Sequence, residues 1–234
     1  ENSWAEAYYK KVCPSVKVHW CPLCISREFE RERWSADKIV PYTLMCSAAN
    51  YPIKGLHMLL KALVIVKAKY PEVKLSIPGT ALRKLTGLKA RFKQNGYEKF
   101  IRNLIEELGL KQNVEYTGRL TAAEMAKKMS ESNSFVMCSA IENHSSTLKE
   151  AMTVGVPCVA SYVGGVPEYA VNNENCLLYR FEDYEVLAQH IIHLFESRDL
   201  CRRLSDRAVS DMAESRAKND FYEISKKVYE RLME

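Results

Sequence analysis

Residues 134–152 read SFVMCSAIENHSSTLKEAM and pass from an apolar run through a polar segment into a helical pattern. The run SFVMCSA is short and continuously apolar, which is typical of a buried strand in a parallel sheet. The polar residues after it favour the end of a strand or the start of a helix, and Glu142 and Glu150 bracket them. Ligands of open α/β sheets bind where loops leave the carboxyl ends of strands, so we expect a ligand site at this loop.

The same alternation of strand and helix extends along most of the chain. Apolar runs predict strands at 42–48, 73–79, 113–118, 134–140, 157–165 and 175–180. Helical periodicity predicts helices at 55–70, 98–110 and 121–132, and the pattern is helical from residue 182 to the end. Apolar strands separated by helices indicate a parallel sheet covered on both faces. The predicted fold class is α/β, a Rossmann-like doubly wound parallel sheet.

The first 40 residues break this rhythm. They hold two helical or turn-like pieces around a short predicted strand, VKVHW, at 16–20. We interpret 1–40 as a linker or the tail of a preceding domain, and 41–234 as the Rossmann-like domain. The chain starts at Glu1, inside an apparent helix, so we expect it to be a piece of a longer protein.

The composition disfavours a nucleic-acid-binding protein and a membrane-spanning protein. The 234 residues carry a formal net charge of +5, and Lys and Arg are spread along helices, whereas duplex nucleic-acid binders have a denser basic face. We therefore expect no nucleic-acid partner. No apolar run approaches the roughly 20 residues of a membrane span. Most of the eight cysteines lie in apolar runs, which favours a reducing, cytoplasmic location, and the mild positive charge allows contact with the inner face of the cell membrane.

The polar loop itself suggests an anion site. If a helix starts near Ser145, the amides of Ser145, Ser146 and Thr147 point out of its free end and suit a phosphate. Glu142 then stands at the rim, and Glu150, about two turns along, offers a carboxylate for the vicinal hydroxyls of a sugar or ribose. The plainer alternative is that Glu142 caps the helix and Glu150 is a surface residue.

Further motifs follow in a defined order. They are Glu150–Ala151–Met152, Gly155–Val156–Pro157 leading into a strand, and Gly164–Gly165–Val166–Pro167–Glu168. With E-x7-E before them, Lys54–Gly55 at an earlier helix start and Gly118 ending a strand, they resemble the donor-binding half of the retaining glycosyltransferases of group 1, or family 4. The resemblance covers roughly 42–195. The residues within these motifs are most similar to those of family members found in bacterial polysaccharide biosynthesis.

The resemblance implies the C-terminal half of a GT-B fold, so that 41–234 would be a nucleotide-sugar-binding domain. The whole enzyme would move a sugar from a nucleoside-diphosphate sugar to a glycan or lipid-linked acceptor. Its partners would be the donor, the acceptor and its own N-terminal domain. No cofactor and no metal are implied, because the nucleotide-sugar is a substrate. This chain alone is expected to turn over little or nothing.

The resemblance also assigns roles to individual residues. Lys54 would contact the diphosphate and neutralise charge on the departing nucleotide, and Glu142 would bind donor-sugar hydroxyls, so these two are the expected catalytic residues. The expected substrate-binding residues are Glu150 for the ribose, Ser146 and Thr147 for phosphate, His144 and Ser145 near the sugar, and Arg119 and Leu120 near the base.

Two positions depart from the family pattern. The family commonly has Gly-Arg shortly before Lys-Gly, and here residues 47–50 read SAAN, without an Arg. The family often has Phe-Gly after the first Glu, and here those places hold His144 and Ser145. Loss of that Gly changes how closely the backbone approaches the sugar, so either departure would alter donor choice or affinity.

Other functions stay open at this point. One is another GT-B enzyme, such as a nucleotide-sugar 2-epimerase, and another is a non-catalytic nucleotide-sugar-binding module, which the absent Arg favours. A dinucleotide-dependent dehydrogenase is disfavoured because no G-x-G-x-x-G follows the first strand. The motif CPLC at 21–24, near Cys13 and His19, is interpreted as free thiols because zinc sites of this type need a second pair.

Overall fold

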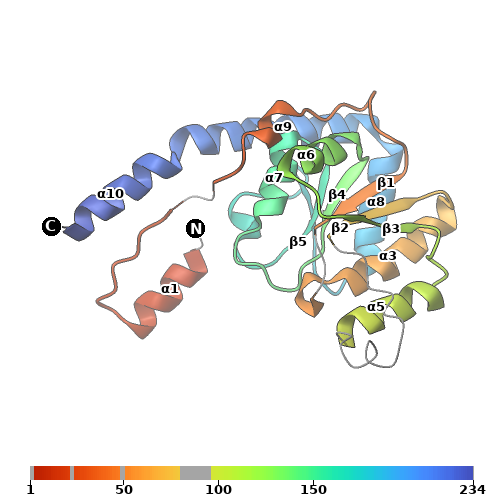
Figure 1. Ribbon diagram of the computed structural model, residues 1–234, viewed down its shortest axis with the longest axis horizontal. Coiled ribbons are helices and arrows are strands. Elements are labelled where there is room, and N and C mark those ends of the chain that lie inside the picture. The colour runs from red at the N-terminus through yellow and green to blue at the C-terminus, as the bar shows by residue number, and fades with distance from the viewer. Residues whose placement is uncertain (1–2, 22–23, 48–50, 80–95, 234) are drawn as a thin grey trace.

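The computed structural model describes residues 3–21, 24–47, 51–79 and 96–233. Its centre is a six-stranded sheet with the order β3-β2-β1-β4-β5-β6, in which all five neighbouring pairs are parallel (Figure 1). The strands are β1 (Thr43–Cys46), β2 (Lys74–Pro78), β3 (Val114–Gly118), β4 (Ser134–Met137), β5 (Cys158–Ser161) and β6 (Leu177–Tyr179). The predicted Rossmann-like α/β fold is confirmed.

Helices cover the sheet in two groups. The first group consists of α3 (Leu56–Lys69), α5 (Gly96–Glu107) and α8 (Tyr184–Glu196), in which α3 contacts the other two. The other group is α2 (Glu28–Arg31), α6 (Ala122–Glu131), α7 (Ser146–Val154) and α9 (Arg198–Lys218), in which α7 contacts the other three. Two short 3-10 turns, η1 (Pro52–Lys54) and η2 (Val166–Glu168), follow β1 and β5.

The order of the strands reverses between β1 and β4, and the region at the carboxyl ends of these two strands is called the crevice below. The chain runs outward from β1 through β2 to β3, and then returns to place β4 on the other side of β1. Met45 pairs with Phe135 and Cys46 with Val136 in parallel register. The loops after β1 and β4 therefore leave the same edge and diverge toward opposite faces, which is the arrangement at which open α/β sheets bind ligands.

Burial explains why the apolar runs form this sheet. Every residue of β4 and β5 is buried, as expected for strands covered on both faces. β3, at the edge, contains no fully buried residue and alternates polar with apolar side chains. Thr121 begins α6 with a capping box, since its hydroxyl accepts from the amide of Glu124 and the Glu124 carboxylate accepts from the Thr121 amide.

The described residues of the N-terminal segment form no strand, and part of the segment packs against the rest of the domain. The predicted strand at 16–20 is wrong, because these residues have no regular secondary structure and no neighbouring strand in the described part of the chain pairs with them. Part of the segment assigned to the tail packs into the domain: Phe29 and Trp34 are buried, and Trp34 Nε1 donates to the carbonyl of Ser132 at 2.9 Å.

Two helices project from this body on the same side (Figure 1). They are α1 (Ser3–Val12) and α10 (Phe221–Met233), and no described side chain in either is fully buried. Both carry exposed aromatic residues, among them Trp4, Tyr8, Tyr222 and Tyr229. None of the helices in the described part of the chain has the length and apolar character that a membrane span requires.

Candidate functional site

Lys54 and Glu142 form an ion pair in the crevice between β1 and β4. Nζ of Lys54, the last residue of η1, lies 2.8 Å from Oε2 of Glu142 in the loop after β4. The side chain of Glu142 is 14% exposed and that of Lys54 is 30% exposed, so both are mostly buried and each keeps some accessible surface. Two residues that the sequence analysis assigned to the same chemistry are therefore in direct contact.

The backbone around this pair is closely packed. Gly55 has a φ of 69°, and a Cβ there would lie 1.7 Å from the carbonyl oxygen of Cys138. The amide of Ala140 donates to the carbonyl of Ile53 at 2.7 Å, and the Cys138 thiol donates to the carbonyl of Lys54 at 3.3 Å. The start of α3 is thus held directly against the end of β4, and this contact requires the glycine after Lys54.

The Gly164–Gly165 turn supports the same loop from the other side. Gly164 has a φ of 52°, and a Cβ there would lie 1.6 Å from the carbonyl oxygen of Glu142. The amide of Gly165 donates to the carbonyl of Asn143 at 3.1 Å. The turn therefore shapes the loop that carries Glu142. Glu168, just after it, accepts from the amide and the hydroxyl of Ser3.

The N-terminus of α7 faces this crevice with open amides. Ser145 is the N-cap, and its hydroxyl accepts from the amide of Leu148. No described residue accepts a hydrogen bond from the amides of Ser146 and Thr147, which remain available to an anion. Ser145 has a φ of −78°, which any residue adopts, so the loop keeps this path without the glycine of the family pattern.

Glu150 lies one turn into α7, four residues after Ser146 on the same helical face. Its side chain is partly buried, and burial raises the pKa of its carboxyl group. No described residue donates a hydrogen bond to it. A partly desolvated carboxylate without a partner is unfavourable in the free protein and suits a ligand that brings its own donors.

His144 belongs to a stack of side chains beside the helix start. Its ring lies 4.8 Å from that of Tyr169 at an interplanar angle of 30°, and Nζ of Lys149 lies 4.9 Å from the centre of the same tyrosine ring. The Tyr169 hydroxyl donates to the carbonyl of Ser145 at 3.4 Å, and burial raises the pKa of this phenol. Tyr169 therefore fixes the imidazole of His144 and the start of α7 together.

Arg119 and Leu120 lie further along the same edge. They follow β3, which is separated from β4 by β2 and β1. Three strand spacings of about 4.8 Å place them roughly 14 Å from the loop after β4. Arg119 is exposed and Leu120 is partly buried. The separation is of the order of a nucleotide's length, so these residues can meet only the far end of such a ligand.

The structure thus brings Lys54, Glu142, His144 and the start of α7 together, with Glu150 beside them. Residues 48–50, where the family's Arg would stand, lie outside the described residues. Two further residues of the site were not expected from the sequence: Ser139, whose hydroxyl donates to Glu142 Oε2 at 3.1 Å, and Tyr169. A polar residue near the end of a mostly apolar run, three positions before Glu142, was the available signal for Ser139.

The cysteines form no comparable centre. All eight are free, and burial raises the pKa of the buried thiols, including Cys138 and Cys176. Among the described residues no three His, Cys, Asp or Glu side chains are grouped as metal ligands. In the CPLC motif Cys21 is partly buried against Ser225 and Cys24 is exposed, while residues 22–23 lie outside the description.

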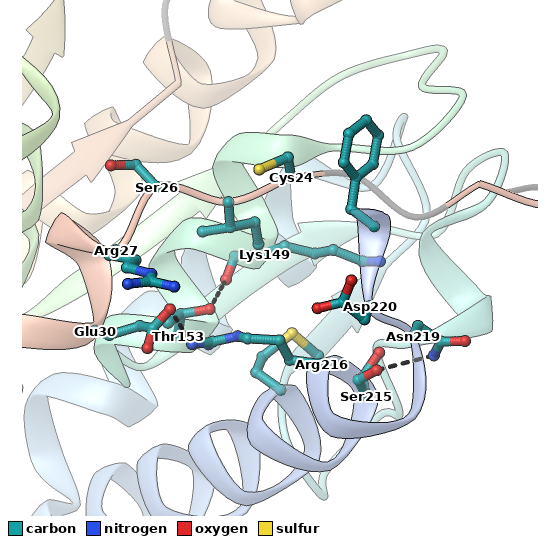
Figure 2. Close-up of a pocket in the computed structure, with 13 residues that line it drawn as sticks. Cys24, Ser26, Arg27, Glu30, Lys149, Thr153, Ser215, Arg216, Asn219 and Asp220 are labelled. Carbon is teal, nitrogen blue, oxygen red and sulfur yellow. Dashed lines mark hydrogen bonds and ion pairs between the residues drawn. The ribbon is translucent and has the colours of Figure 1, made fainter. Parts of the chain in front are cut away.

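A separate cavity of about 320 Å³ lies between α7, the α9–α10 junction and residues 24–30 (Figure 2). Lys149 and Thr153 line it from α7, and Arg216 pairs there with Glu30. None of the site residues expected from the sequence lines this cavity. The candidate site is therefore the crevice, where the Lys54–Glu142 pair and the start of α7 both follow the carboxyl ends of β1 and β4.

Comparison with known families matches residues 26–211 to the model described as "Glycosyl transferases group 1". Because the match covers most of the chain, this protein belongs to that family. A curated relative is the putative colanic acid biosynthesis glycosyltransferase WcaL of Escherichia coli K12, 25% identical over 80% of this chain and 44% of WcaL. The chain spans 28–44% of the length of the curated relatives it matches.

Solved structures share the fold. Sucrose-phosphate synthase from Thermosynechococcus elongatus superposes with a TM-score of 0.78 at 20% identity, over 99% of this chain and 57% of that one. Anabaena Alr3699/HepE in complex with UDP gives 0.66 at 23% identity, over 82% and 49%. The C-terminal domain of a group 1 glycosyl transferase (LpcC) from Francisella tularensis gives 0.62 at 18% identity, over 82% and 93%.

Proposed function

We propose that this chain is the donor-binding, C-terminal half of a retaining GT-B glycosyltransferase. The observation that carries the proposal is the Lys54–Glu142 pair beside the open amides of Ser146 and Thr147, in the crevice between β1 and β4. Membership of the group 1 family and the likeness to the LpcC C-terminal domain support it. The donor is a nucleoside-diphosphate sugar, and the acceptor is a glycan or a lipid-linked glycan.

The proposed chemistry is stabilisation of the leaving diphosphate. Lys54 and the N-terminal amides of α7 lie where negative charge builds as the bond from the sugar to the diphosphate breaks. In the free protein Glu142 holds the ammonium of Lys54 in place, and a donor phosphate takes over that contact. Glu142 is then free to accept hydrogen bonds from the donor sugar. In this proposal protein groups, and no metal ion, supply the positive charge.

The remaining donor contacts follow from their positions along the edge. Glu150 accepts from the two ribose hydroxyls, since its carboxylate has no partner among the described residues and lies on the helical face of Ser146. Arg119 and Leu120 meet the base, three strands away. His144, held against Tyr169, and Ser145 border the sugar. The likeness to a structure with bound UDP supports a nucleotide along this edge.

The proposed partner is the enzyme's own N-terminal domain. The exposed aromatic residues Trp4, Tyr222 and Tyr229 lie on α1 and α10, which project on one side of the body (Figure 1). Exposed aromatic side chains on projecting helices are typical of a surface that another domain covers. We place the enzyme in the cytoplasm, because its eight cysteines are free, with contact at the inner membrane face for a lipid-linked acceptor.

Calorimetric titration with UDP, GDP, ADP and their sugar conjugates tests the proposal, with Glu150→Ala as the site variant. We expect one diphosphate to bind and the variant to weaken that binding, which also names the base. If the chain binds none at millimolar concentration, the titration is repeated on the full-length protein. If the full-length protein also binds none, the transferase proposal is overturned. A product assay of the full-length protein that finds a product other than a transferred sugar, such as an epimerised donor, also overturns it.

A further inference from the structure

Glu142 is held by more than Lys54. We propose that Ser139 is a positioning residue that fixes the carboxylate of Glu142 for the donor sugar, with Ser161 as its support. This inference rests on the proposed function. Ser139 follows β4 and Ser161 ends β5, so neither belongs to the motifs that brought Glu142 and Lys54 to attention.

Two hydrogen bonds link these three residues, one through the backbone of Ser139 and one through its side chain. Oγ of Ser161 donates to the carbonyl of Ser139 at 2.6 Å, and Oγ of Ser139 donates to Oε2 of Glu142 at 3.1 Å. Both serines are 0% exposed. Because β4 and β5 are paired neighbours, the support extends from two rigid strands to a carboxylate on a loop.

The geometry separates the two oxygens of Glu142. Oε2 receives both Ser139 Oγ and Lys54 Nζ, whereas no described residue donates to Oε1. One oxygen is therefore anchored and the other is presented to a ligand. A hydroxyl donating to an anchored carboxylate also prevents the side chain from rotating among its alternative conformers, which preserves a productive geometry.

Ser139 matters most when the donor is bound. In the proposed function the diphosphate draws the ammonium of Lys54 away from Glu142. The hydroxyl of Ser139 then remains as the protein donor on Oε2. Ser139→Ala removes this hydroxyl and leaves the loop's backbone contacts intact, because these involve the carbonyls of Ile53, Glu142 and Asn143 rather than this side chain.

The test compares sugar binding with diphosphate binding in the same variants. Ser139→Ala and Ser161→Ala are titrated with UDP, UDP-glucose, GDP and GDP-mannose. The full-length protein is used if the chain alone shows no binding. We expect Ser139→Ala to weaken the sugar conjugate about tenfold, as loss of a hydrogen bond to a charged group does, and to leave the bare diphosphate unchanged. Ser161→Ala acts in the same direction with a smaller loss.

Ser132→Ala is the matched control. Ser132 is also buried, at 3% exposed, and its hydroxyl donates to the carbonyl of Lys128 at 2.7 Å, at the far end of β4. A merely structural role of Ser139 lowers the melting temperature, as in this control, without altering the ratio of the two affinities. If Ser139→Ala does not fold, Ser139→Cys, a near-isostere with a weaker donor, replaces it.

The outcomes distinguish the two proposals. A selective loss of the sugar conjugate in Ser139→Ala, absent in Ser132→Ala, supports the positioning role. Equal losses for conjugate and diphosphate, or no loss, overturn that role and leave the donor site standing. If the unaltered full-length protein binds none of UDP, GDP, ADP and their sugar conjugates, the proposed function is wrong and the positioning role falls with it.

Discussion

Nζ of Lys54 lies 2.8 Å from Oε2 of Glu142, although 88 positions of sequence separate the two residues. The contact joins the loop after β1 to the loop after β4 and so spans the point at which the strand order reverses. Both groups are partly buried, and each compensates the charge of the other in the free protein. Removal of either partner therefore changes the environment of the residue that stays and, in the proposed function, ligand binding as well.

Lys54→Ala tests the cation of the site. We expect it to weaken binding of the nucleoside diphosphate at least about tenfold, because a charge-assisted contact to phosphate is lost. The measurement is calorimetric titration at fixed ionic strength. Lys67→Ala, at the far end of α3, removes the same charge from the chain and serves as control. Equal losses in the two variants would mean that only the net charge matters and would remove Lys54 from the site.

Glu150→Gln is expected to stabilise the fold and to weaken nucleotide binding. Burial raises the pKa of Glu150 above its unfolded value, so its ionisation costs folding free energy at neutral pH. The variant should melt about 1 °C higher near pH 7 and bind nucleotide more weakly. The gain should shrink as the pH falls through the folded pKa, because the native carboxyl then protonates. Glu131→Gln, on the surface of α6, should show neither effect, and a lower melting temperature for Glu150→Gln at pH 7 would contradict the prediction.

Alanine substitutions at three glycines distinguish the cost of a steric clash from the cost of backbone strain. Gly96→Ala should be neutral or stabilising by about 0.5 kcal/mol, because a Cβ there meets nothing within 4 Å. Gly109→Ala should cost about 1 kcal/mol, since its φ is 65° but the space is open. Gly164→Ala should cost about 3 kcal/mol or more, because the Cβ collides with the Glu142 carbonyl. Urea unfolding measures all three, and an unchanged Gly164→Ala would mean that the turn does not hold the loop.

Removal of residues 221–234 tests the role of α10. None of its described side chains is fully buried, so the melting temperature of the chain should change by less than about 2 °C. In the full-length protein the same truncation should abolish transfer, because the aromatic face would no longer contact the other domain. Tyr222→Ala with Tyr229→Ala should reproduce the loss, and Glu223→Ala with Glu230→Ala should not. Full activity after truncation would exclude the proposed contact.

A chelator tests the assignment of positive charge to the protein. Lys54 and the α7 amides are proposed to stabilise the leaving diphosphate, so EDTA should leave transfer by the full-length enzyme unchanged. The measurement is the initial rate before and after dialysis against EDTA. Loss of activity that Mg²⁺ or Mn²⁺ restores would show that a divalent ion supplies part of that charge.

The sheet was predictable because its strands are buried on both faces. Each of the six apolar runs became a strand, and only the ends differ: the run at 157–165 yields the shorter β5, since Gly164 and Gly165 form a turn that packs on another loop. The strand predicted at 16–20 failed for the opposite reason. A strand needs a neighbour to pair with, and periodicity in one segment says nothing about whether that neighbour exists.

The residues of the candidate site that belong to sequence motifs could be predicted, but those that join it through a tertiary contact could not. Lys54 and Glu142 were expected to serve one reaction, but their ion pair depends on the strand order, which sequence pattern does not reveal. Ser139 and Tyr169 act through bonds to Glu142 and to the carbonyl of Ser145, and serine or tyrosine in an apolar run is ordinary core composition. Such residues become visible only once the loops are placed in space.

The two glycine contacts, at Gly55 and Gly164, have a consequence for how this site can diversify. Backbone touches backbone at both places, with no side chain between, so neither loop can shift without breaking the other's support. A descendant that accepts a different donor must therefore keep the course of these loops. The freedom to change lies in side chains that project from that fixed frame, and His144 and the exposed Arg119 are the first of them.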